Sequence, residues 1–540
     1  SPRTDVVSDL EKNHLIHVGA SRVEPNVIPA LSFGALGAPI RQAVWSVSPP
    51  STQTIVDRYI RTKSYYEVSC TGEPFQIGLN DCLRQFPTSS ITDTVTVQIN
   101  GETLSANIGD YIHAIGAFNT TAAERVKSLS TTAAQPDQYQ EYSDWAVYGS
   151  ARNVMCSVGE NSAEISRGGL DYDIAPDGKS FRIAITEPLF LSPLYSGHSQ
   201  QQPEGMVNIN QINITLRYSN ILSKILSHSS LGGNLGTVSV SFYRPPELII
   251  NYLSPDLTQM LPSVQTLPYS QYQEYIRPVG IVPANTDLTV LSDSVKLSMI
   301  PNRMYLFCRH TRALMNENLT DSFLRINRVR VNFNNESSLL GTASPEELFE
   351  ISSRAGLDMA FVQYQKYRGS VFCLQFGKDI GLSDSLAPGV AGQFTVSTQI
   401  DVTNVSTLPH DYEFFMVFEM GGTLSLFENG ARASIGNLTQ AEVLEARMNA
   451  PRLDYHQAGR LSGSGFFGDL KRFANKVSRG VQGASKFVGD VASNIPLPIA
   501  QQIAQGARTV NSVAGSIRGA TGGALRGGRQ SGGMLSRRRM

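Results

Sequence analysis

The chain has 540 residues with 45 basic and 46 acidic side chains, a formal net charge of −1. At roughly 100–200 residues per domain, this length predicts two to four domains. No run of about 18 apolar residues occurs, which excludes a hydrophobic membrane-spanning helix, and the start, Ser1 to Asp5, lacks the apolar core of a signal peptide. The charge is divided unevenly: residues 461–540 carry +10 and residues 1–460 carry −11.

The cysteines are odd in number and scattered, without a CxxC pair, which argues against a disulfide framework or a zinc site. We expect most of them to be small buried residues of a chain that folds in a reducing compartment, cytoplasm or nucleus. They are Cys70, Cys82, Cys156, Cys308 and Cys373.

The first β patterns follow a mixed, Pro-containing segment, residues 1–45, which we interpret as an arm that packs on something else. Residues 94–99 alternate strictly and run into Asn100-Gly101, the strongest short signal for a hairpin turn. Residues 207–218 change the phase of their apolar alternation, which predicts a β-bulge or a bend. A strand over 237–243 is expected to end at Pro245-Pro246, because proline cannot continue a central ladder.

A stretch rich in Pro, Tyr and Gln, residues 255–283, is predicted to be an extended linker with turns. Strand patterns then resume, and the run at 414–418 is continuously apolar, as in a strand buried on both faces. Two helices are expected, each opening with a capping box, Ser344 with Glu347 and Thr439 with Glu442. The predicted strands are 295–300, 304–308, 329–333, 394–402 and 414–418, and the helices are 344–352 and 439–448.

Many short strands in two blocks of about 200 and about 170 residues predict an all-β chain of two sandwiches in series. In each block a strand runs into an Asn-containing turn, at 94–101 and at 329–335, which is faint support for a duplicated domain. Stretches 116–180 and 336–370 suit surface excursions. The expected divisions are an arm (1–45), a first sandwich (46–253), a linker (254–283), a second sandwich (284–450) and a tail (451–540).

A collinear series of segments between about residues 45 and 447 resembles the major capsid proteins of virophages and polinton-like viruses. No one segment is specific, but their order is preserved. They are Ser48–Arg58, Phe86–Thr92 followed by Ile99–Gly101, Ile300–Phe307, Gly377–Leu382, and Ala433–Gly436 followed by Glu442–Leu444.

This resemblance implies a double jelly roll, a Sputnik-like all-β fold, in a non-enzymatic protein of the virion. It also implies homotrimers whose six jelly rolls form a pseudo-hexagonal capsomer, and an icosahedral lattice that contacts penton and minor capsid proteins and encloses double-stranded DNA. No small-molecule substrate is implied. The tail departs from the Sputnik-like pattern, which favours a polinton-like relative over a close virophage sibling.

No catalytic, cofactor or metal site is predicted. Residues 369–378 lack phosphate-loop spacing and indicate a strand with a turn. His113 lies in an apolar context typical of a hydrogen-bonded core histidine, and His14 and His17 are interpreted as part of a solvated arm rather than a metal pair. Asp379 and Asp384 are expected to accept hydrogen bonds from turn amides. The alternative function is a carbohydrate-binding or carbohydrate-active β-sandwich, for which Trp45 and Trp145 are the only tryptophans.

The C-terminal tail is both basic and amphipathic. Its apolar residues recur at helical spacing, and the ending is rich in Gly and Arg. Three roles remain open: a basic arm inside the shell that neutralises DNA phosphates, a membrane-binding segment, and a cement that packs under neighbouring capsomers. The apolar face is Phe466, Leu470, Phe473, Val477 and Val481; the basic residues are Lys471, Arg472, Lys476, Arg479, Lys486, Arg508, Arg518, Arg526, Arg529, Arg537, Arg538 and Arg539.

Overall fold

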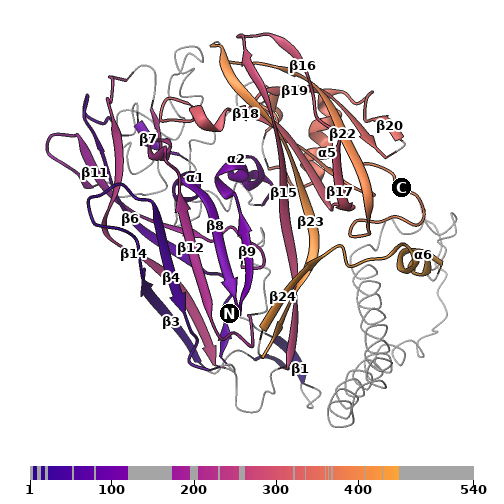
Figure 1. The fold of residues 1–540 in the computed structure, drawn as a ribbon, viewed down its shortest axis with the longest axis horizontal. Coiled ribbons are helices and arrows are strands. Elements are labelled where there is room, and N and C mark those ends of the chain that lie inside the picture. Colours follow the sequence, from indigo (N-terminus) through magenta and orange to yellow (C-terminus); the bar gives the residue numbers. More distant parts are fainter. Residues whose placement is uncertain are drawn as a thin grey trace, which may run out of the picture. The chain divides into compact units, whose positions relative to one another are not determined.

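The computed structural model places most of the chain up to residue 448 in antiparallel β-sheets (Figure 1). Every strand pair among the described residues is antiparallel, and small helices lie beside the sheets. The structure describes residues 4–8, 14–18, 22–51, 54–77, 81–84, 86–119, 173–194, 205–228, 232–254, 262–319, 323–334, 336–358, 360–362, 364–365, 369–406, 408–428 and 430–448.

The first jelly roll consists of two facing sheets. One follows the order β10-β11-β6-β14-β3, with β5 also paired to β14, and the other follows β4-β12-β8-β9. Two-stranded pairs β1-β2 and β7-β13 and short helices complete this half. The bounds are β1 Thr4–Ser8, β2 His14–Val18, β3 Arg22–Pro29, β4 Gln42–Val47, β5 Ile55–Val56, β6 Arg61–Cys70, β7 Asp81–Leu83, α1 Pro87–Ser90, β8 Thr92–Ile99, β9 Glu102–Ala106, α2 Ile108–Asn119, β10 Asp173–Ile174, β11 Ser180–Pro188, β12 Ile212–Tyr218, the 3-10 helix η4 Leu222–Ile225, β13 Leu226–His228 and β14 Val238–Ser254.

The second jelly roll is built in the same way. Its sheets follow the orders β15-β23-β18-β21, with β24 also paired to β23, and β16-β22-β19-β20, with β17 also paired to β22. The bounds are β15 Val264–Val282, β16 Asp287–Leu291, β17 Val295–Met299, β18 Arg303–His310, the 3-10 helix η5 Arg312–Leu314, β19 Arg325–Phe333, β20 Glu336–Leu339, α5 Pro345–Arg354, β21 Phe372–Gln375, β22 Ala391–Thr403, β23 His410–Phe427, β24 Gly430–Ile435 and α6 Gln440–Met448.

The two jelly rolls have matching strand orders. Strands β3, β14, β6 and β11 occupy the positions that β15, β23, β18 and β21 occupy in the second half, and β4, β12, β8 and β9 correspond to β16, β22, β19 and β20. The order of these elements along the chain is also the same, and α2 and α5 both follow the hairpin of their own half. The faint sequence hint of a duplicated domain is thus supported by the topology of both sheets.

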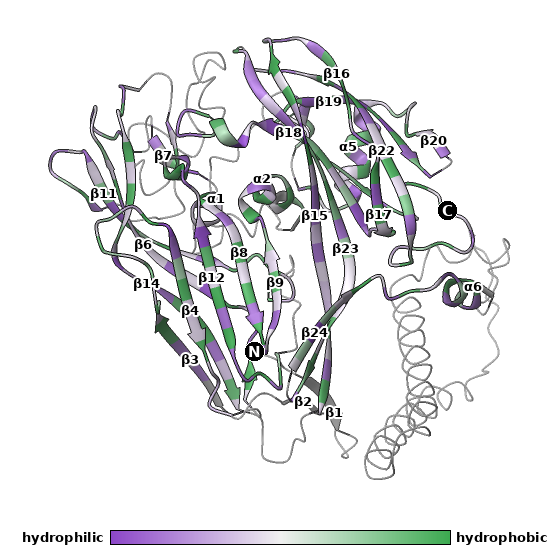
Figure 2. Ribbon diagram, in the orientation of Figure 1, coloured by the Kyte–Doolittle hydropathy of each residue, from purple (hydrophilic) through white to green (hydrophobic). Residues whose placement is uncertain are grey.

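The local sequence signals correctly located several elements. Strand β8 ends at Asn100-Gly101, where both residues have positive φ (48° and 92°) and Ile99 pairs with Glu102, as a two-residue hairpin of type I′ requires. The Ser344–Glu347 capping box of α5 is formed by both of its hydrogen bonds. Along the exposed strands, polar and apolar residues alternate (Figure 2), because successive side chains point to opposite faces.

The predicted linker is wrong for most of its length. Residues 264–282 form β15, which pairs with β23 throughout. Pro268 and Pro278 are both even-numbered, and the backbone N–H groups of alternate residues in a strand point to the same edge. Both prolines therefore lack an N–H on the edge that faces away from β23, where no ladder hydrogen bond is lost. Ser270, of that same parity, donates its outward N–H to the hydroxyl of Ser192 at 2.9 Å.

Two other boundaries also differ from the predictions. Strand β14 continues through Pro245-Pro246, because register shifts between Phe242 and Glu247 form a bulge that needs no ladder N–H there. The expected N-terminal arm contributes β3 and β4 to the first jelly roll, where they pair with β14 and β12. Residues 336–370 are only partly a surface excursion, since α5 buries Leu348 completely.

The structure also describes the predicted bend before β12 and several histidines and turn carboxylates that the sequence singled out. The phase change between Ile209 and Ile212 falls where β12 begins, shortly after a bend at Asn208, which has φ 60°. His14 and His17 belong to a strand, β2. His113 is buried and contacts the Ser90 hydroxyl at 2.8 Å, as a core histidine should. Asp379 accepts the Gln375 amide, as expected for a turn carboxylate.

Candidate functional site: the junction of the two jelly rolls

The sheet β15-β23-β18-β21 is buried on both of its faces, because it belongs to two cores. The odd-numbered residues of β18 and of the middle of β23, such as Tyr305 and Phe415, pack in a cluster that continues into the first jelly roll. Their even-numbered neighbours, such as Leu306 and Phe414, pack in the core of the second jelly roll. The continuously apolar run at 414–418 is explained by this double burial, which confirms the sequence interpretation.

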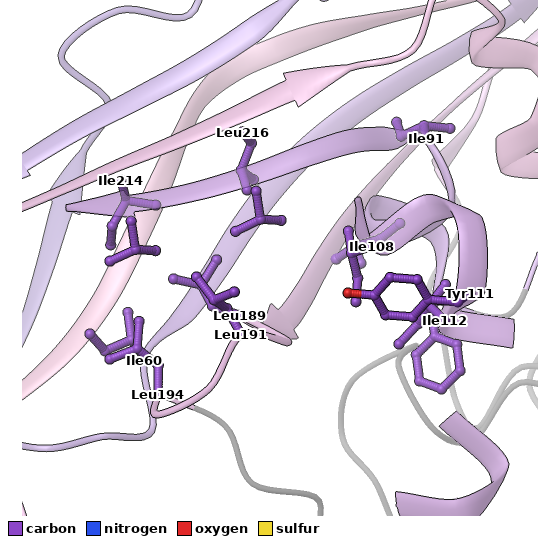
Figure 3. Packing of buried hydrophobic residues seen from close by; sticks show 14 of the residues in the cluster. Ile60, Ile91, Ile108, Tyr111, Ile112, Leu189, Leu191, Leu194, Ile214 and Leu216 are labelled. Carbon is purple, nitrogen blue, oxygen red and sulfur yellow. The ribbon is translucent and has the colours of Figure 1, made fainter. Parts of the chain in front are cut away.

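Helix α2 of the first jelly roll packs two aromatic rings against this sheet. The ring of Tyr111 lies 5.3 Å from that of Tyr272, and the ring of Phe118 lies 5.2 Å from that of Tyr305 in an edge-to-face arrangement. Figure 3 shows Tyr111 and its helix neighbours beside the aliphatic residues that fill the first jelly roll. Aromatic pairs of this geometry contribute roughly 0.5–1.5 kcal/mol beyond their buried area.

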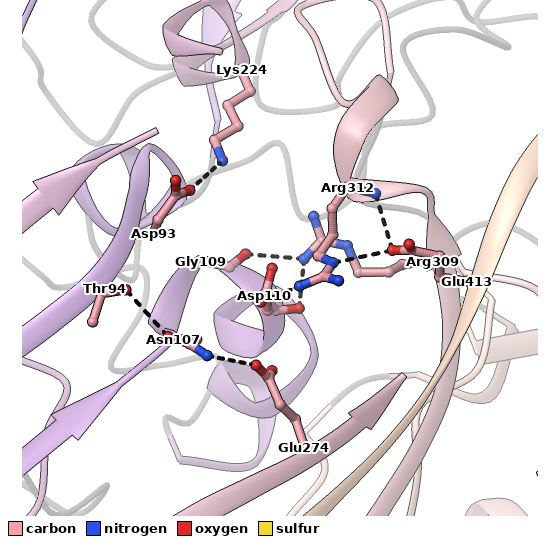
Figure 4. Close-up of polar contacts among 10 residues, drawn as sticks. All are labelled: Asp93, Thr94, Asn107, Gly109, Asp110, Lys224, Glu274, Arg309, Arg312 and Glu413. Carbon is pink, nitrogen blue, oxygen red and sulfur yellow. Dashed lines mark hydrogen bonds and ion pairs between the residues drawn. The ribbon is translucent and has the colours of Figure 1, made fainter. Parts of the chain in front are cut away.

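A polar network surrounds the first turn of α2 (Figure 4). Arg309 donates to the carbonyl oxygens of Gly109 (3.0 Å) and Asp110 (2.6 Å), and Arg312 donates to the Asp110 carboxylate (2.9 Å) and to Glu413 (3.3 Å). Through these hydrogen bonds, two arginines of the second jelly roll contact the first turn of α2 in the first jelly roll. The pKa of Arg312 is raised: burial alone would lower it, but the charges of Asp110 and Glu413 outweigh that effect.

Asn107 and Glu274 extend the network on the other side of α2. The Asn107 amide donates to the Glu274 carboxylate at 2.8 Å. Burial raises the pKa of Glu274, the hydrogen bond from Asn107 lowers it, and the nearby Asp110 charge raises it again. The junction therefore holds an acidic group whose protonation is favoured by its surroundings.

A second contact joins the jelly rolls through a buried arginine. Arg84, at 1% exposure, donates hydrogen bonds to four backbone carbonyl oxygens, two from each jelly roll. Backbone carbonyls carry partial negative charge, so they solvate the guanidinium where water does not reach it. The acceptors are Lys224 (2.7 Å) and Leu226 (3.1 Å) in the first half and Asn316 (2.8 Å) and Leu319 (2.5 Å) in the second.

An ion pair lies beside Arg84. Nδ1 of His228 is 2.6 Å from the carboxylate of Asp81, and the His228 backbone N–H donates to Glu317 of the second jelly roll at 2.7 Å. Burial alone would lower the pKa of His228, but the hydrogen bond and charge of Asp81 raise it above its usual value. The ion pair joins β7 to β13, and the backbone hydrogen bond of His228 attaches both strands to the segment that follows η5.

A third contact lies where β15, β23 and β24 extend beyond the second jelly roll. The Gln265 side chain accepts the Val207 amide (2.9 Å) and donates to the Gly205 carbonyl (2.8 Å). Glu102 of β9 accepts the amide of Ala433 in β24 at 3.1 Å. Three separate contacts, spread along the junction, therefore hold the two jelly rolls in one orientation.

The junction offers packing and hydrogen bonding, and we find no reaction chemistry in it. Within the described residues, no group of three or more His, Cys, Asp or Glu side chains could hold a metal ion. No helix in the described part of the chain is long and apolar enough to cross a bilayer. Cys70, Cys308 and Cys373 are free and buried, as predicted for those three positions.

The predicted tail residues and the junction residues are different sets. All seventeen candidate positions, from Phe466 to Arg539, lie outside the described residues, as do Cys156 and Trp145. Arg84, Arg309 and Arg312 were missed by the sequence reasoning. No local motif could have found them, because their partners lie about 100 to 235 positions away in the chain.

Family models match both halves of the chain. Residues 25–177 match the Sputnik virophage major capsid protein 1st domain, and residues 269–422 match the Major capsid protein V20 C-terminal domain. The putative capsid protein V20 of Sputnik virophage is 29% identical over 576 aligned positions, which cover 96% of this chain and 94% of that protein. Since residues 449–540 exceed the uncovered 4%, the alignment reaches into the tail, whereas the family models end at residue 422.

Solved structures show the same fold. The Sputnik virophage structure determined by cryo-EM matches with a TM-score of 0.72 and 26% identity, covering 84% of this chain and 97% of that one. The mavirus major capsid protein matches with a TM-score of 0.62 at 12% identity, covering 80% and 93%. The relatives are structural capsid proteins rather than enzymes, in agreement with the sequence prediction. With both jelly rolls matched in order, the chain belongs to the virophage major capsid proteins.

Proposed function

We propose that the chain forms homotrimers in which six jelly rolls make a pseudo-hexagonal capsomer, and that these capsomers tile an icosahedral shell around double-stranded DNA. The observation that carries this proposal is the duplicated sheet order in one chain. Three copies of a unit with two equivalent halves supply six similar blocks, so a three-fold ring approximates a hexagon. Hexagonal blocks can then pack side by side in a closed lattice.

The rigid junction supports this assignment physically. A shell needs building blocks whose edges keep fixed positions, because many weak contacts add up only if all of them can form together. The aromatic contacts of α2, the buried Arg84 and the β24 contact restrain the two halves at separate points. Penton and minor capsid proteins would meet the outer edges of the same block.

For the tail, residues 451–540, we propose a position on the interior side of the shell, where its twelve basic residues after Leu461 would neutralise DNA phosphates. Contact with a membrane and packing under neighbouring capsomers remain the two other roles to test. The amphipathic series from Phe466 to Val481 suits either of them.

The test is the oligomeric state of the purified full-length chain. Sedimentation velocity should detect trimers, and negative-stain microscopy should show hexagonal particles or shells at suitable salt concentrations. Monomers under every condition of salt and concentration would refute the capsomer proposal. The carbohydrate alternative loses one of its two candidate platforms, because Trp45 is fully buried and cannot stack on a sugar.

A further inference from the structure

The outer face of the sheet β11-β6-β14-β3 carries an array of tyrosines and cations. Opposite residues of neighbouring strands share a face: Tyr65 lies opposite Arg244 and Glu67 lies opposite Arg182, while Tyr66, between them, points into the core. We call this surface the tyrosine–arginine face. Its members are Arg61, Lys63, Tyr65, Glu67, Arg182, Tyr243, Arg244 and Glu247.

These side chains are held in place by one another. The guanidinium carbon of Arg244 lies 4.6 Å from the Tyr65 ring centre, and that of Arg182 lies 5.3 Å from the Tyr243 ring centre. The Tyr65 hydroxyl donates to Glu247 at 2.7 Å. Tyr65 is only 5% exposed beneath its neighbours, so the accessible part of this face is formed by Arg182, Arg244 and the half-buried Tyr243. Tyr and Arg are residue types that protein interfaces favour.

The duplicated topology indicates what this face binds. Its counterpart in the second jelly roll is the face of β21-β18-β23-β15, which packs on α2 of the first jelly roll. In that internal junction, the acidic first turn of the helix, at Asp110, meets arginines of the sheet side. The helix that corresponds to α2 in the second jelly roll is α5, and its first turn is also acidic, with Glu346 and Glu347.

The charges of the two surfaces are complementary. The tyrosine–arginine face has four cations and two carboxylates. Helix α5 has three glutamates, all exposed, and one arginine. We call the exposed pair Glu346 and Glu350 the acidic face of α5, since Glu347 is engaged in the capping box.

We propose that the tyrosine–arginine face of one copy binds the acidic face of α5 in a second copy, which repeats the internal junction between subunits. The proposal rests on the trimer of the proposed function and assigns its contact surfaces. One surface meets a different surface of the next copy, so the contacts form a closed ring when the rotation is three-fold. The internal contact combines aromatic packing with ion pairs and hydrogen bonds, whereas this one is mainly polar because the free subunit exposes it to water.

Charge reversal on the full-length chain tests the assignment. Arg182→Glu with Arg244→Glu should weaken self-association about tenfold or more, since like charges then face each other. Glu346→Lys with Glu350→Lys should weaken it similarly. A chain with all four changes restores opposite charges at every contact and should recover most of the lost affinity. Sedimentation equilibrium measures each dissociation constant.

The matched control is Lys296→Glu with Arg328→Glu, two exposed cations on the β16-β22-β19 sheet, which has no counterpart contact in the internal junction. It should leave the association unchanged. Thermal melting checks folding, and the single change Arg182→Glu, at a side chain that is 50% exposed, serves if a double variant unfolds. If the wild type assembles and the double variants assemble equally well, or the fourfold variant is no better than they are, the assignment of surfaces is wrong. A wild type that stays monomeric refutes the trimer itself.

Discussion

The guanidinium of Arg312, in the second jelly roll, lies 2.9 Å from the carboxylate of Asp110, at the start of α2 in the first. Arg312 keeps 43% of its side chain exposed, so water screens this ion pair. Arg84 joins the same two halves from a site with 1% exposure and is bound by carbonyl oxygens of both. Two arginines in similar cross-links should therefore differ widely in their contribution to stability.

Arg84→Ala should lower the free energy of unfolding by about 3–5 kcal/mol, because it leaves buried carbonyl oxygens without their donor. Arg312→Ala should cost about 0.2–1 kcal/mol, as exposed ion pairs do. Urea unfolding followed by circular dichroism measures both, with the exposed Arg328→Ala as the control. Equal losses for Arg84 and Arg312 would contradict the role given to burial.

Glu187 should make stability depend on pH in the range where most carboxylates no longer titrate. It is completely buried and accepts the Thr88 amide at 2.7 Å and the Ser89 hydroxyl at 2.8 Å. Burial raises its pKa from 4.5 to about 7, although these hydrogen bonds oppose the shift. Because the pKa is higher in the folded state, the proton it retains stabilises the fold below about pH 4.5, and this contribution disappears as the pH rises through 7.

Between about pH 4.5 and pH 7, the titration of Glu187 should lower the free energy of unfolding by about 3 kcal/mol. Glu187→Gln should be less stable than the wild type at pH 5, because its amide N–H₂ faces the Ser89 donors, and the difference should narrow by pH 8. Denaturant unfolding at a series of pH values gives both curves. Parallel curves for the two proteins would show that Glu187 does not cause the dependence.

Gly421 and Gly422 interrupt β23 at the point where the strand changes the face that it turns toward the first jelly roll. Phe415 and Val417 are odd-numbered, yet the even-numbered Leu424 belongs to the same core cluster. A Cβ atom at Gly422 would overlap the carbonyl oxygen of Ser434 in β24. The strand pair therefore needs a residue without a side chain at this position.

Gly422→Ala should lower the free energy of unfolding by at least about 1–3 kcal/mol, the usual cost of overpacking. The added methyl group should also push β24 away from β23. Gly430→Ala, in the neighbouring strand, is the control, since nothing lies within 4 Å of a Cβ there. Thermal melting compares the two variants. A Gly422→Ala protein as stable as the control would mean that the strands separate without cost.

Truncation at Gly459 should leave trimers intact and weaken DNA binding, because the basic positions from Lys471 to Arg539 are removed. Each lost phosphate contact should reduce the salt slope of log K by about 0.9 for duplex DNA. Fluorescence anisotropy with a DNA duplex at several salt concentrations measures this slope. An unchanged slope would exclude the DNA-arm role, and loss of trimers would instead favour the cement role.

Much of the β architecture could be predicted from local patterns. Alternation located β8 and β22, Asn100-Gly101 marked the hairpin, and the capping boxes placed α5 and α6, because these signals depend on neighbours within a few residues. Proline misled the prediction at 245–246 and at 268–278. The effect of a proline depends on whether its missing N–H points toward a partner strand or away from it, and pairing partners are not visible locally.

By itself, the sequence determined the strands with clear alternation, such as β8 and β22, together with the Asn100-Gly101 turn, the basic tail and the resemblance to a capsid family, since each follows from residues close together in the chain. Only the tertiary structure decided that Arg84 joins the jelly rolls, that β15 is a strand rather than a linker, and that the two halves share one sheet order. The reason is distance along the chain: Arg84 and Leu319 are 235 positions apart. A contact between residues so far apart exists only when two sheets pack, and no periodicity records it.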